Sequence, residues 1–488
     1  MSKAYVEVPG KVWLFVMIGS GLGLLSSNPL LTVTSLMILP FLIFSLWRKG
    51  EAPILSFLLF FQWLESTLKV FNADFAGIRV EGVVKMGEGI WATYFYSKEA
   101  TKAIGLCLGA LASLAIGMRL GISRIRRSPS QEFQIKASPF SIEKLFGFYL
   151  ITFIISAFSN FLVWRFLSLS QILLAMMSVK WAILYLLVYT ILQRKSRHVY
   201  LVLVFIMEIS AGFISYFAQF RGVIYIVAVA FLALHFRFRA RHILAGLFIL
   251  LIALYLGSVW SVVKKDIRTF MDQAEQEEIS LSLEKRVQKV TGLVQGFNSE
   301  KIQTGLVRLV GRISYVDFFS QVLLMVPRSI PHEGGELWKK ALIHVMTPRL
   351  FFRNKTDLEP DSDVTRRYTN IQVAGGSKGG KTSIGIGYVA ESYVDFGPKF
   401  MFVPIFLVGL LEGLICRYFI SKSKMKLTGS ALSVATLLFS GSSIAISAAK
   451  ILGGVLTNFI VLVLFLKLFE RSFIQEMTSK SLIRFQKS

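Results

Sequence analysis

The chain has 488 residues, of which 54% are hydrophobic and 17% charged, and its mean hydropathy is +0.60. Polar groups cannot cover the surface of so apolar a chain in water, so the composition excludes an ordinary soluble protein and predicts a lipid bilayer as the solvent. The net charge of +25 would suggest nucleic acid binding in a soluble chain, but many basic residues here lie in short turns between apolar runs, so we expect no nucleic-acid partner.

About twelve stretches are long and apolar enough to cross a membrane as helices, since a span needs about twenty apolar residues. The expected spans are residues 12–27, 30–47, 52–70, 102–118, 145–164, 172–192, 199–219, 222–236, 243–263, 400–420, 430–449 and 451–469. We therefore predict an all-α polytopic membrane protein. Residues 1–263 hold the first nine spans, residues 264–399 form a long loop, and residues 400–488 hold the last three spans and a tail.

The turns between these spans alternate in charge, and clusters of Lys and Arg in short loops are typical of the cytoplasmic side of a membrane. Such clusters occur in every second turn, at Arg48 and Lys49, at Arg119, Arg124, Arg126 and Arg127, at Arg194, Lys195 and Arg197, at Arg237, Arg239 and Arg241, and at Lys422, Lys424 and Lys426. The alternation predicts that both termini lie in the cytoplasm and that residues 71–101 and 264–399 lie on the outer side.

The long outer loop contains further predicted helices. Residues 301–326 are apolar enough to pack on the membrane domain, and Arg308, Arg312 and Tyr315 recur there at i, i+4 and i+7, hence on one helix face. We expect this helix to end at Pro327, because proline cannot continue it.

Two shorter segments complete the loop. Residues 336–346 have the pattern of an amphipathic helix, whereas residues 347–387, rich in charge and glycine, are expected to form a loop. Within it GGSKGGKT, residues 375–382, matches the phosphate-binding loop of nucleotide triphosphatases letter for letter. That motif needs a preceding strand and a following helix, and neither is evident here, so we predict no such enzyme. A flexible turn and a backbone contact to a phosphate are the alternatives left.

Basic residues near the outer mouth of the spans are candidates for binding phosphate. Arg221 follows the seventh expected span in FAQFRG, and the run PRLFFRNK contains Arg349, Arg353 and Lys355. Arginine presents a planar fork of N–H donors that matches phosphate oxygens. The alternatives are an arginine that reaches the membrane surface at position 221 and a solvated charge run in the loop.

Carboxylates just before the tenth expected span are candidates for accepting a proton. Glu391 and Asp395 lie one helical turn apart in GYVAESYVDFG, where a carboxylate near the membrane surface can take a proton from a hydroxyl group; an ion pair with an arginine is the alternative. Lys180 and Glu208 are expected at similar depth in consecutive spans, which favours a buried pair over a proton relay. No cluster has metal-ligand spacing, so we expect neither a metal nor a cofactor.

Four segments carry a resemblance to a known family: FRG after a mid-chain span, GRISY and TPRLFFRNK in the long outer loop, and GYVAESYVDFG before the next span. Covering roughly Ser215 to Arg417, they resemble the Wzy-type O-antigen polymerases of the O-antigen ligase and polymerase superfamily. The resemblance implies a glycosyltransferase of the GT-C type in the bacterial inner membrane. Such an enzyme joins oligosaccharide repeat units carried on undecaprenyl pyrophosphate, so that lipid-linked oligosaccharide is the implied partner, and a chain-length regulator is a second partner to consider.

The resemblance also implies roles for single residues, with basic side chains in place of a metal at the leaving pyrophosphate. Arg221 matches the arginine after the mid-chain span and Arg312 the arginine of the loop helix. We place Glu391 beside them as the group that orients or deprotonates the acceptor. Further pyrophosphate contacts are expected from Arg308, Arg349, Arg353 and Lys355, and acceptor contacts from Tyr315, Tyr388 and Asp395.

Two other functions stay open. Related ligases carry a histidine before the span that follows the long loop, and this chain has no His between residues 345 and 488, which favours a polymerase over a ligase. A lipid-linked oligosaccharide flippase, which is not an enzyme, would place charges along a central cavity. Only Lys180, Glu208 and Glu412 lie well inside the expected spans, which is few for such a cavity.

Overall fold

The computed structural model describes most of the chain. The described residues are 10–46, 53–86, 93–96, 98–123, 138–165, 170–214, 221–234, 314–348, 351–352, 354–373, 375–378 and 383–478, with scattered positions between 248 and 313. The chain divides into two compact units, the first made of residues 1–186 and 314–488 and the second of residues 187–313.

The described elements are helical apart from one hairpin. The first unit holds α1 (Gly10–Gly23), α2 (Pro29–Leu46), α3 (Pro53–Phe75), α4 (Ala100–Ile122), α6 (Ile142–Arg165), α7 (Ser170–Met176), α14 (Val316–Met325), α15 (Glu336–Met346), α16 (Asp361–Thr369), the 3-10 turn η4 (Gly376–Lys378), α17 (Tyr388–Phe400), α18 (Phe402–Lys422), α19 (Lys426–Leu437) and α20 (Ala448–Met477). Strands β1 (Val83–Met86) and β2 (Thr93–Tyr96) pair antiparallel between α3 and α4. The second unit holds α9 (His198–Ile214) and α10 (Arg221–Leu234), and α8 (Ser178–Arg194) runs across the division.

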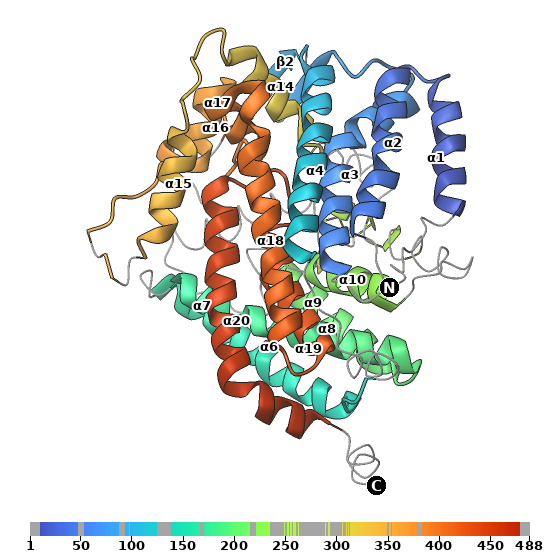
Figure 1. Cartoon of the computed structure of the whole chain (residues 1–488), viewed down its shortest axis with the longest axis vertical. Helices are drawn as coiled ribbons and strands as arrows, with labels where there is room; N and C mark the ends of the chain where they lie inside the picture. The colour runs from blue at the N-terminus through green and yellow to red at the C-terminus, as the bar shows by residue number, and fades with distance from the viewer. Residues whose placement is uncertain are drawn as a thin grey trace. The chain divides into compact units, whose positions relative to one another are not determined.

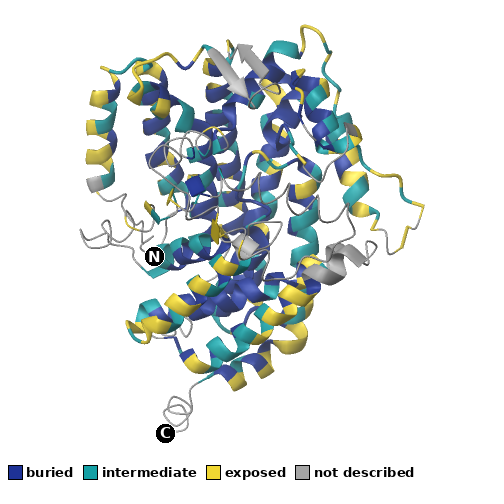
Figure 2. Ribbon diagram, turned by 180° about the vertical axis from the view of Figure 1, so that it is seen from behind, coloured by how far each residue is buried: buried dark blue, intermediate teal, exposed yellow. Residues whose placement is uncertain are grey.

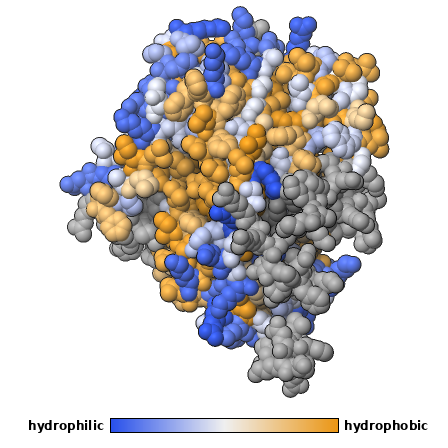
Figure 3. All heavy atoms as spheres, viewed as in Figure 1, coloured by the Kyte–Doolittle hydropathy of each residue, from blue (hydrophilic) through white to orange (hydrophobic). Residues whose placement is uncertain are grey.

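The protein is a helical membrane protein. Among the described residues, seven helices are long and apolar enough to cross a bilayer: Pro29–Leu46, Pro53–Phe75, Ala100–Ile122, Ile142–Ser159, Leu173–Arg194, Phe402–Lys422 and Ala448–Met477. Over α15, α18 and α20 the space-filling view shows a broad hydrophobic zone (Figure 3), whereas buried residues line the inner faces of the packed helices (Figure 2). Apolar side chains that face outward fit a lipid solvent.

The described residues do not confirm the expected number of twelve spans. The expected spans 12–27, 199–219 and 222–236 coincide with apolar helices of fewer than 18 residues, and most of 243–263 lies outside the described residues. The expected span 430–449 is wrong as a continuous helix, because α19 ends at Leu437 and α20 begins at Ala448.

The segment between α19 and α20, residues 438–447, is a helix break held by side chains of another helix. In α3, the Gln62 Nε2 donates to the Gly441 carbonyl at 2.7 Å, and the Glu65 carboxylate accepts from the Ile444 N–H at 2.7 Å. The Tyr388 N–H donates to the Ile446 carbonyl at 2.7 Å. Buried backbone groups need partners, and the α3 side chains together with the Tyr388 backbone provide them where the helix is interrupted.

Two GxxxG pairs hold α4 against α18. A Cβ atom added at Gly117 would lie 2.2 Å from the Phe406 carbonyl oxygen, and one at Gly413 would lie 2.3 Å from the Met118 carbonyl oxygen. The same holds for Gly121 and Gly409. Small residues let membrane helices approach closely and pack by van der Waals contact, so these glycines allow the two backbones to touch.

The predicted elements of the outer loop are partly confirmed. The predicted amphipathic helix 336–346 coincides with α15, and α14 ends at Met325, before Pro327. Residues 314 and 315 are not helical, so the prediction of one helix over 301–326 is wrong. The prediction of a loop over 347–387 is also wrong, because α16 forms there.

Helix α16 forms because its ends suit the helix dipole. Asp361 and Asp363 lie in its first turn, Arg366 and Arg367 lie in its last turn, and Asn370 ends it in the left-handed conformation. The charge of this segment, which predicted a loop, therefore stabilises a helix.

The described parts of the two predicted outer segments that belong to the first unit lie toward the same end of its helices. Figure 1 shows β2, α14, α16 and α17 at the same end as the start of α4. Arg328, after α14, forms an ion pair with Glu99, before α4, at 2.9 Å, and Lys69 of α3 pairs with Asp317 of α14. The predicted topology requires this common end; which end faces the cytoplasm stays a prediction.

Candidate functional site

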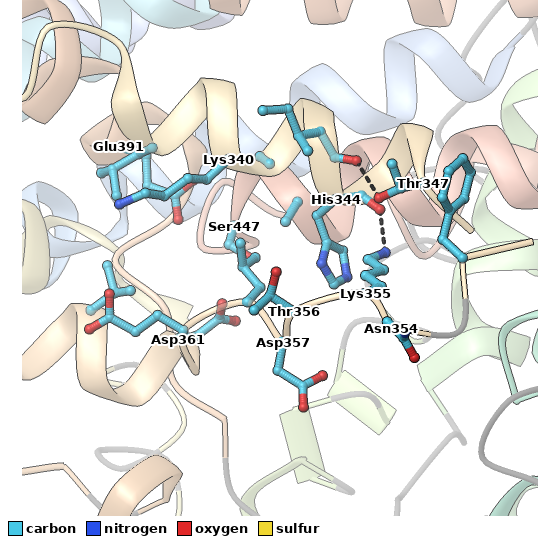
Figure 4. Close-up of a pocket in the computed structure, with 18 of the residues that line it drawn as sticks. Lys340, His344, Thr347, Asn354, Lys355, Thr356, Asp357, Asp361, Glu391 and Ser447 are labelled. Carbon is cyan, nitrogen blue, oxygen red and sulfur yellow. Dashed lines mark hydrogen bonds between the residues drawn. The ribbon is translucent and has the colours of Figure 1, made fainter. Parts of the chain in front are cut away.

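A cavity of about 960 Å³ lies in the first unit between α15, the turn that follows it, α16 and the starts of α17 and α20 (Figure 4). Its polar lining is Lys340, His344, Thr347, Asn354, Lys355, Thr356, Asp357, Glu359, Asp361, Glu391 and Ser447, and its apolar lining is Leu337, Ala341, Ile343, Phe351, Phe352, Leu358, Val364 and Ala449. A volume of this size suits a small-molecule site, and the mixed lining suits a ligand with polar and apolar parts.

Glu391 reaches this cavity from the first turn of α17. Its side chain is 7% exposed, and its Oε2 accepts a hydrogen bond from the Ala448 N–H at 2.7 Å. Burial raises the pKa of Glu391 to about 8, with further upward contributions from the charges of Asp361 and Asp395, and the Ala448 N–H opposes the shift. The carboxylate therefore titrates close to neutral pH.

Gly387 fixes where α17 begins. Its φ of +83° is favourable only for glycine, and a Cβ atom there would lie 2.3 Å from the Ile444 carbonyl oxygen of the helix break. The close approach places Glu391 beside the start of α20, where the Ala448 N–H is free to donate to it.

Other polar groups surround Glu391. Asp361 accepts an ion-pair contact from Lys450 at 2.7 Å, and Lys450 also donates to the Ser383 hydroxyl at 2.7 Å. The Ser447 hydroxyl is buried, lines the cavity and has no hydrogen-bond partner among the described residues. An unpaired buried hydroxyl is costly, so this group is available to a ligand.

The turn that closes the cavity is held by Lys355, whose ammonium group donates to the His344 carbonyl at the end of α15 (Figure 4). Lys355 and Glu391 are the predicted site residues that line the cavity within the described part of the chain. The Lys355 ammonium group already has a protein partner in this geometry, and its predicted contact with pyrophosphate stays a prediction.

Three predicted acceptor-binding residues take other contacts, outside the cavity lining. The Asp395 carboxylate accepts from the Trp338 and Leu337 N–H groups at 2.8 and 3.1 Å and so caps the start of α15. The Tyr315 hydroxyl accepts from the Ala390 N–H at 3.0 Å, and the Tyr388 hydroxyl donates to Gln62 at 2.8 Å. In this structure they hold α17 in position, and burial raises the pKa of Tyr315 well above its ordinary value.

The predicted arginine cluster is mostly outside the described residues, which is the case for Arg308, Arg312, Arg349 and Arg353. Arg221 is described; it is the first residue of α10 in the second unit, and it is exposed. The convergence of these arginines on one pyrophosphate site stays a prediction.

The described part of the triphosphatase-like loop is a turn packed on α16. The Ser377 N–H donates to the Asp363 carboxylate at 3.0 Å, and Arg366 donates to the carbonyl groups of Val373 and Gly375 at 2.6 and 3.0 Å. No strand precedes it within residues 354–373. Residues 379–382, including Lys381, lie outside the described part. The geometry favours a structural turn over a phosphate cradle.

Lys180 and Glu208 are both buried, at 4% and 3% exposed, as charges inside spans are expected to be. Lys180 belongs to the first unit, where its ammonium group lies 4.1 Å from the centre of the Trp181 ring. Glu208 belongs to the second unit, and the pairing of the two stays a prediction.

Sequence reasoning missed Lys340, His344, Asp361, Ser447 and Lys450 as neighbours of Glu391. They come from three segments, α15 and the starts of α16 and α20, that only the fold brings together, so no spacing in the sequence predicts the group. The one local signal was the acidic run after Lys355, residues 357–363, which favoured the alternative of a solvated charge run.

Comparison with known proteins places the chain in a family. No group of three or more His, Cys, Asp and Glu side chains among the described residues is arranged to hold a metal ion. No curated protein and no solved structure matches the chain. A family model does match residues 88–475, which include the whole cavity lining. The chain belongs to the family described as a domain of unknown function, DUF8712.

Proposed function

We propose that the protein is a membrane glycosyltransferase of the GT-C type that polymerises undecaprenyl-pyrophosphate-linked oligosaccharide repeat units into a surface polysaccharide in the bacterial inner membrane. The observation that supports this best is a buried carboxylate, Glu391, in the wall of an amphiphilic cavity at the end of the membrane helices. The sequence resemblance supports the reaction type.

The proposed reaction needs a weak base and a stabilised leaving group. An acceptor hydroxyl oxygen attacks the anomeric carbon of the donor, and its proton passes to the Glu391 carboxylate. The bond between that carbon and the pyrophosphate oxygen breaks, and the electron pair leaves with the pyrophosphate. A base with a pKa near the working pH is suited to this transfer, and the pKa of about 8 meets that condition.

The arginines hold the leaving pyrophosphate in this proposal, with Arg221 and Arg312 as the main ligands. Fixed positive donors stabilise the charge that develops as the bond breaks, and losing one typically costs on the order of 100-fold or more in rate. Arg221→Lys should be nearly as harmful as Arg221→Ala, because a point charge cannot reproduce the guanidinium fork.

The test uses purified full-length protein with lipid-linked repeat units and follows the polymer ladder on a gel. We expect Glu391→Gln to lower turnover by about 100-fold or more, while substrate binding is largely kept. Glu336→Gln is the matched control, since Glu336 is an exposed first-turn carboxylate paired with Lys339. Polymer formation by Glu391→Gln at the wild-type rate would remove Glu391 as the base.

A lipid-linked oligosaccharide flippase is the second candidate, and the helix break favours it. Interrupted membrane helices form substrate and ion sites in many transporters, and the buried Glu65 and Glu412 both lie at this break. In proteoliposomes a flippase would move the lipid-linked unit across the bilayer without lengthening it, whereas a polymerase would lengthen it. A ligase would transfer it to a different acceptor lipid.

A further inference from the structure

The end of α15 exposes an apolar surface that no described part of the protein covers. Trp338 and Ala341 of this helix are buried. The apolar edge, by contrast, is 49–76% exposed and consists of Leu342, Ile343, Met346, Phe351 and Phe352. The surfaces of soluble proteins rarely carry so many large apolar side chains close together. We therefore expect the apolar edge to lie in an apolar environment.

The position of α15 along the length of α20 indicates that this environment is a lipid bilayer. Val345 lies 3.6 Å from the position of a Cβ atom at Gly453, so the last turn of α15 packs beside that point of α20 (Figure 1). Gly453 lies within residues 451–466, which carry no charge, and roughly 8 Å along the helix from its first residue at 1.5 Å per residue. An interfacial helix buries its apolar face about 5–10 Å into the boundary of headgroups and acyl chains.

The charged side chains of α15 are distributed in the same direction, from a charged first half to the apolar edge at its end. Glu336, Lys339 and Lys340 lie in its first half, at the end capped by Asp395, and the apolar edge lies at the opposite end. Lysine near the headgroups and apolar side chains below them is the arrangement that a bilayer surface favours.

The apolar edge is also a wall of the cavity. Ile343, Phe351 and Phe352 are exposed and also line the cavity, whose polar lining includes Glu391 and Asp361. The cavity therefore has an apolar wall that is also part of the exposed apolar edge, and carboxylates in its polar lining.

We propose that the apolar edge of α15 inserts into the bilayer leaflet that contains the start of α20, and that the cavity takes its ligand sideways from that leaflet. The ligand class is an amphiphile with a polar headgroup on a long lipid chain; this part rests on the proposed function, whereas the insertion does not. The headgroup lies toward Glu391, and the first lipid segments pass along Phe351 and Phe352.

Fluorescence quenching in lipid vesicles tests the insertion without any assay of activity. Leu342→Cys, Met346→Cys and Phe351→Cys are labelled with a small fluorophore in the full-length protein, and Arg367→Cys on α16 is the matched exposed control. Both native cysteines are buried and should not label. We expect lipids with brominated acyl chains to quench the three test positions at least about twofold more than the control. Iodide should instead quench the control more than the three test positions. Iodide quenching of the test positions equal to that of the control would overturn the insertion.

Kinetics test the sideways access separately. Replacing both Phe351 and Phe352 by Ser should raise KM for a long-chain lipid-linked unit on the order of tenfold, because the lipid loses apolar contact. KM for a short-chain, water-soluble analogue should change by less than about twofold. An equal rise for both substrates would overturn the access route. An inactive wild-type protein would instead refute the proposed function, while the quenching result would still decide the insertion.

Discussion

Glu391 lies where three helices begin. It is in the first turn of α17, accepts a hydrogen bond from Ala448 at the start of α20, and lines the same cavity as Asp361 at the start of α16. Helix N-termini favour negative charge, but desolvation is the larger effect here and raises the pKa of this carboxyl. The balance explains why the proton of Glu391 is released close to neutral pH.

The pH dependence of rate and stability should follow this shift. The ordinary pKa of the group is 4.5 and the folded-state value is about 8. Between these two values the folded state binds more protons than the unfolded chain, so its contribution to stability is full below pH 4.5 and is lost as pH rises through 8. The rate needs the ionised form and should rise with pH up to about 8.

Thermal unfolding and turnover over the range from acid to pH 9 measure both effects. Glu391→Gln should be least stable relative to wild type at low pH, and this difference should shrink or reverse as the pH rises. A wild-type rate that is flat across pH 6–9 would contradict the assignment of Glu391 as the base.

Glu412 of α18 is a second buried carboxylate, and its surroundings differ from those of Glu391. It is 1% exposed, and both carboxylate oxygens have no hydrogen-bond partner among the described residues. Glu412→Gln keeps the shape and removes an ionisable group that is buried without a partner among the described residues, so we expect a melting temperature equal to or above that of wild type. A loss of more than about 1 kcal/mol of stability would show that the carboxylate has a partner.

At the scale of the helices, local pattern predicted some elements and failed for others. The apolar spacing of 336–346 predicted α15, because that helix has one buried face against α20. The apolar run 430–449 predicted one span, but Glu65 and Gln62, which are distant in the sequence, stabilise the break within it. No pattern within such a segment reveals partners from another helix.

The contact of α4 with α18 gives a prediction at this scale. Gly413→Ala places a methyl group against the Met118 carbonyl oxygen, and neither backbone can move without separating the helices. We expect a loss of about 1–3 kcal/mol in the free energy of unfolding, the usual cost of overpacking.

Gly105→Ala is the control, since a Cβ atom at Gly105 of α4 meets nothing within 4 Å. It should be neutral or slightly stabilising, because alanine favours a helix more than glycine does. Thermal unfolding of both variants in the same detergent makes the comparison, and equal melting temperatures would show that the close approach does not support the fold.

At the scale of the whole molecule, orientation in the membrane is the open prediction. Ser329 follows α14 at the end that we expect outside, and Ser421 lies in the last turn of α18 at the opposite end; both are exposed. In intact cells an impermeant thiol reagent should label Ser329→Cys and spare Ser421→Cys, as the alternation of basic turns predicts. Labelling of Ser421→Cys alone would invert the topology.

The sequence by itself determined that this chain belongs in a bilayer. Apolar runs and basic turns direct a chain into a membrane through their own composition, whichever other segments pack against them. It also singled out Glu391 from local surroundings. Only the tertiary structure decided that Glu391 shares a cavity with Lys340, Asp361 and Ser447, and that Asp395 caps α15. These are contacts between segments far apart in the chain, and burial, hydrogen bonding and pKa depend on such contacts and not on the order of residues.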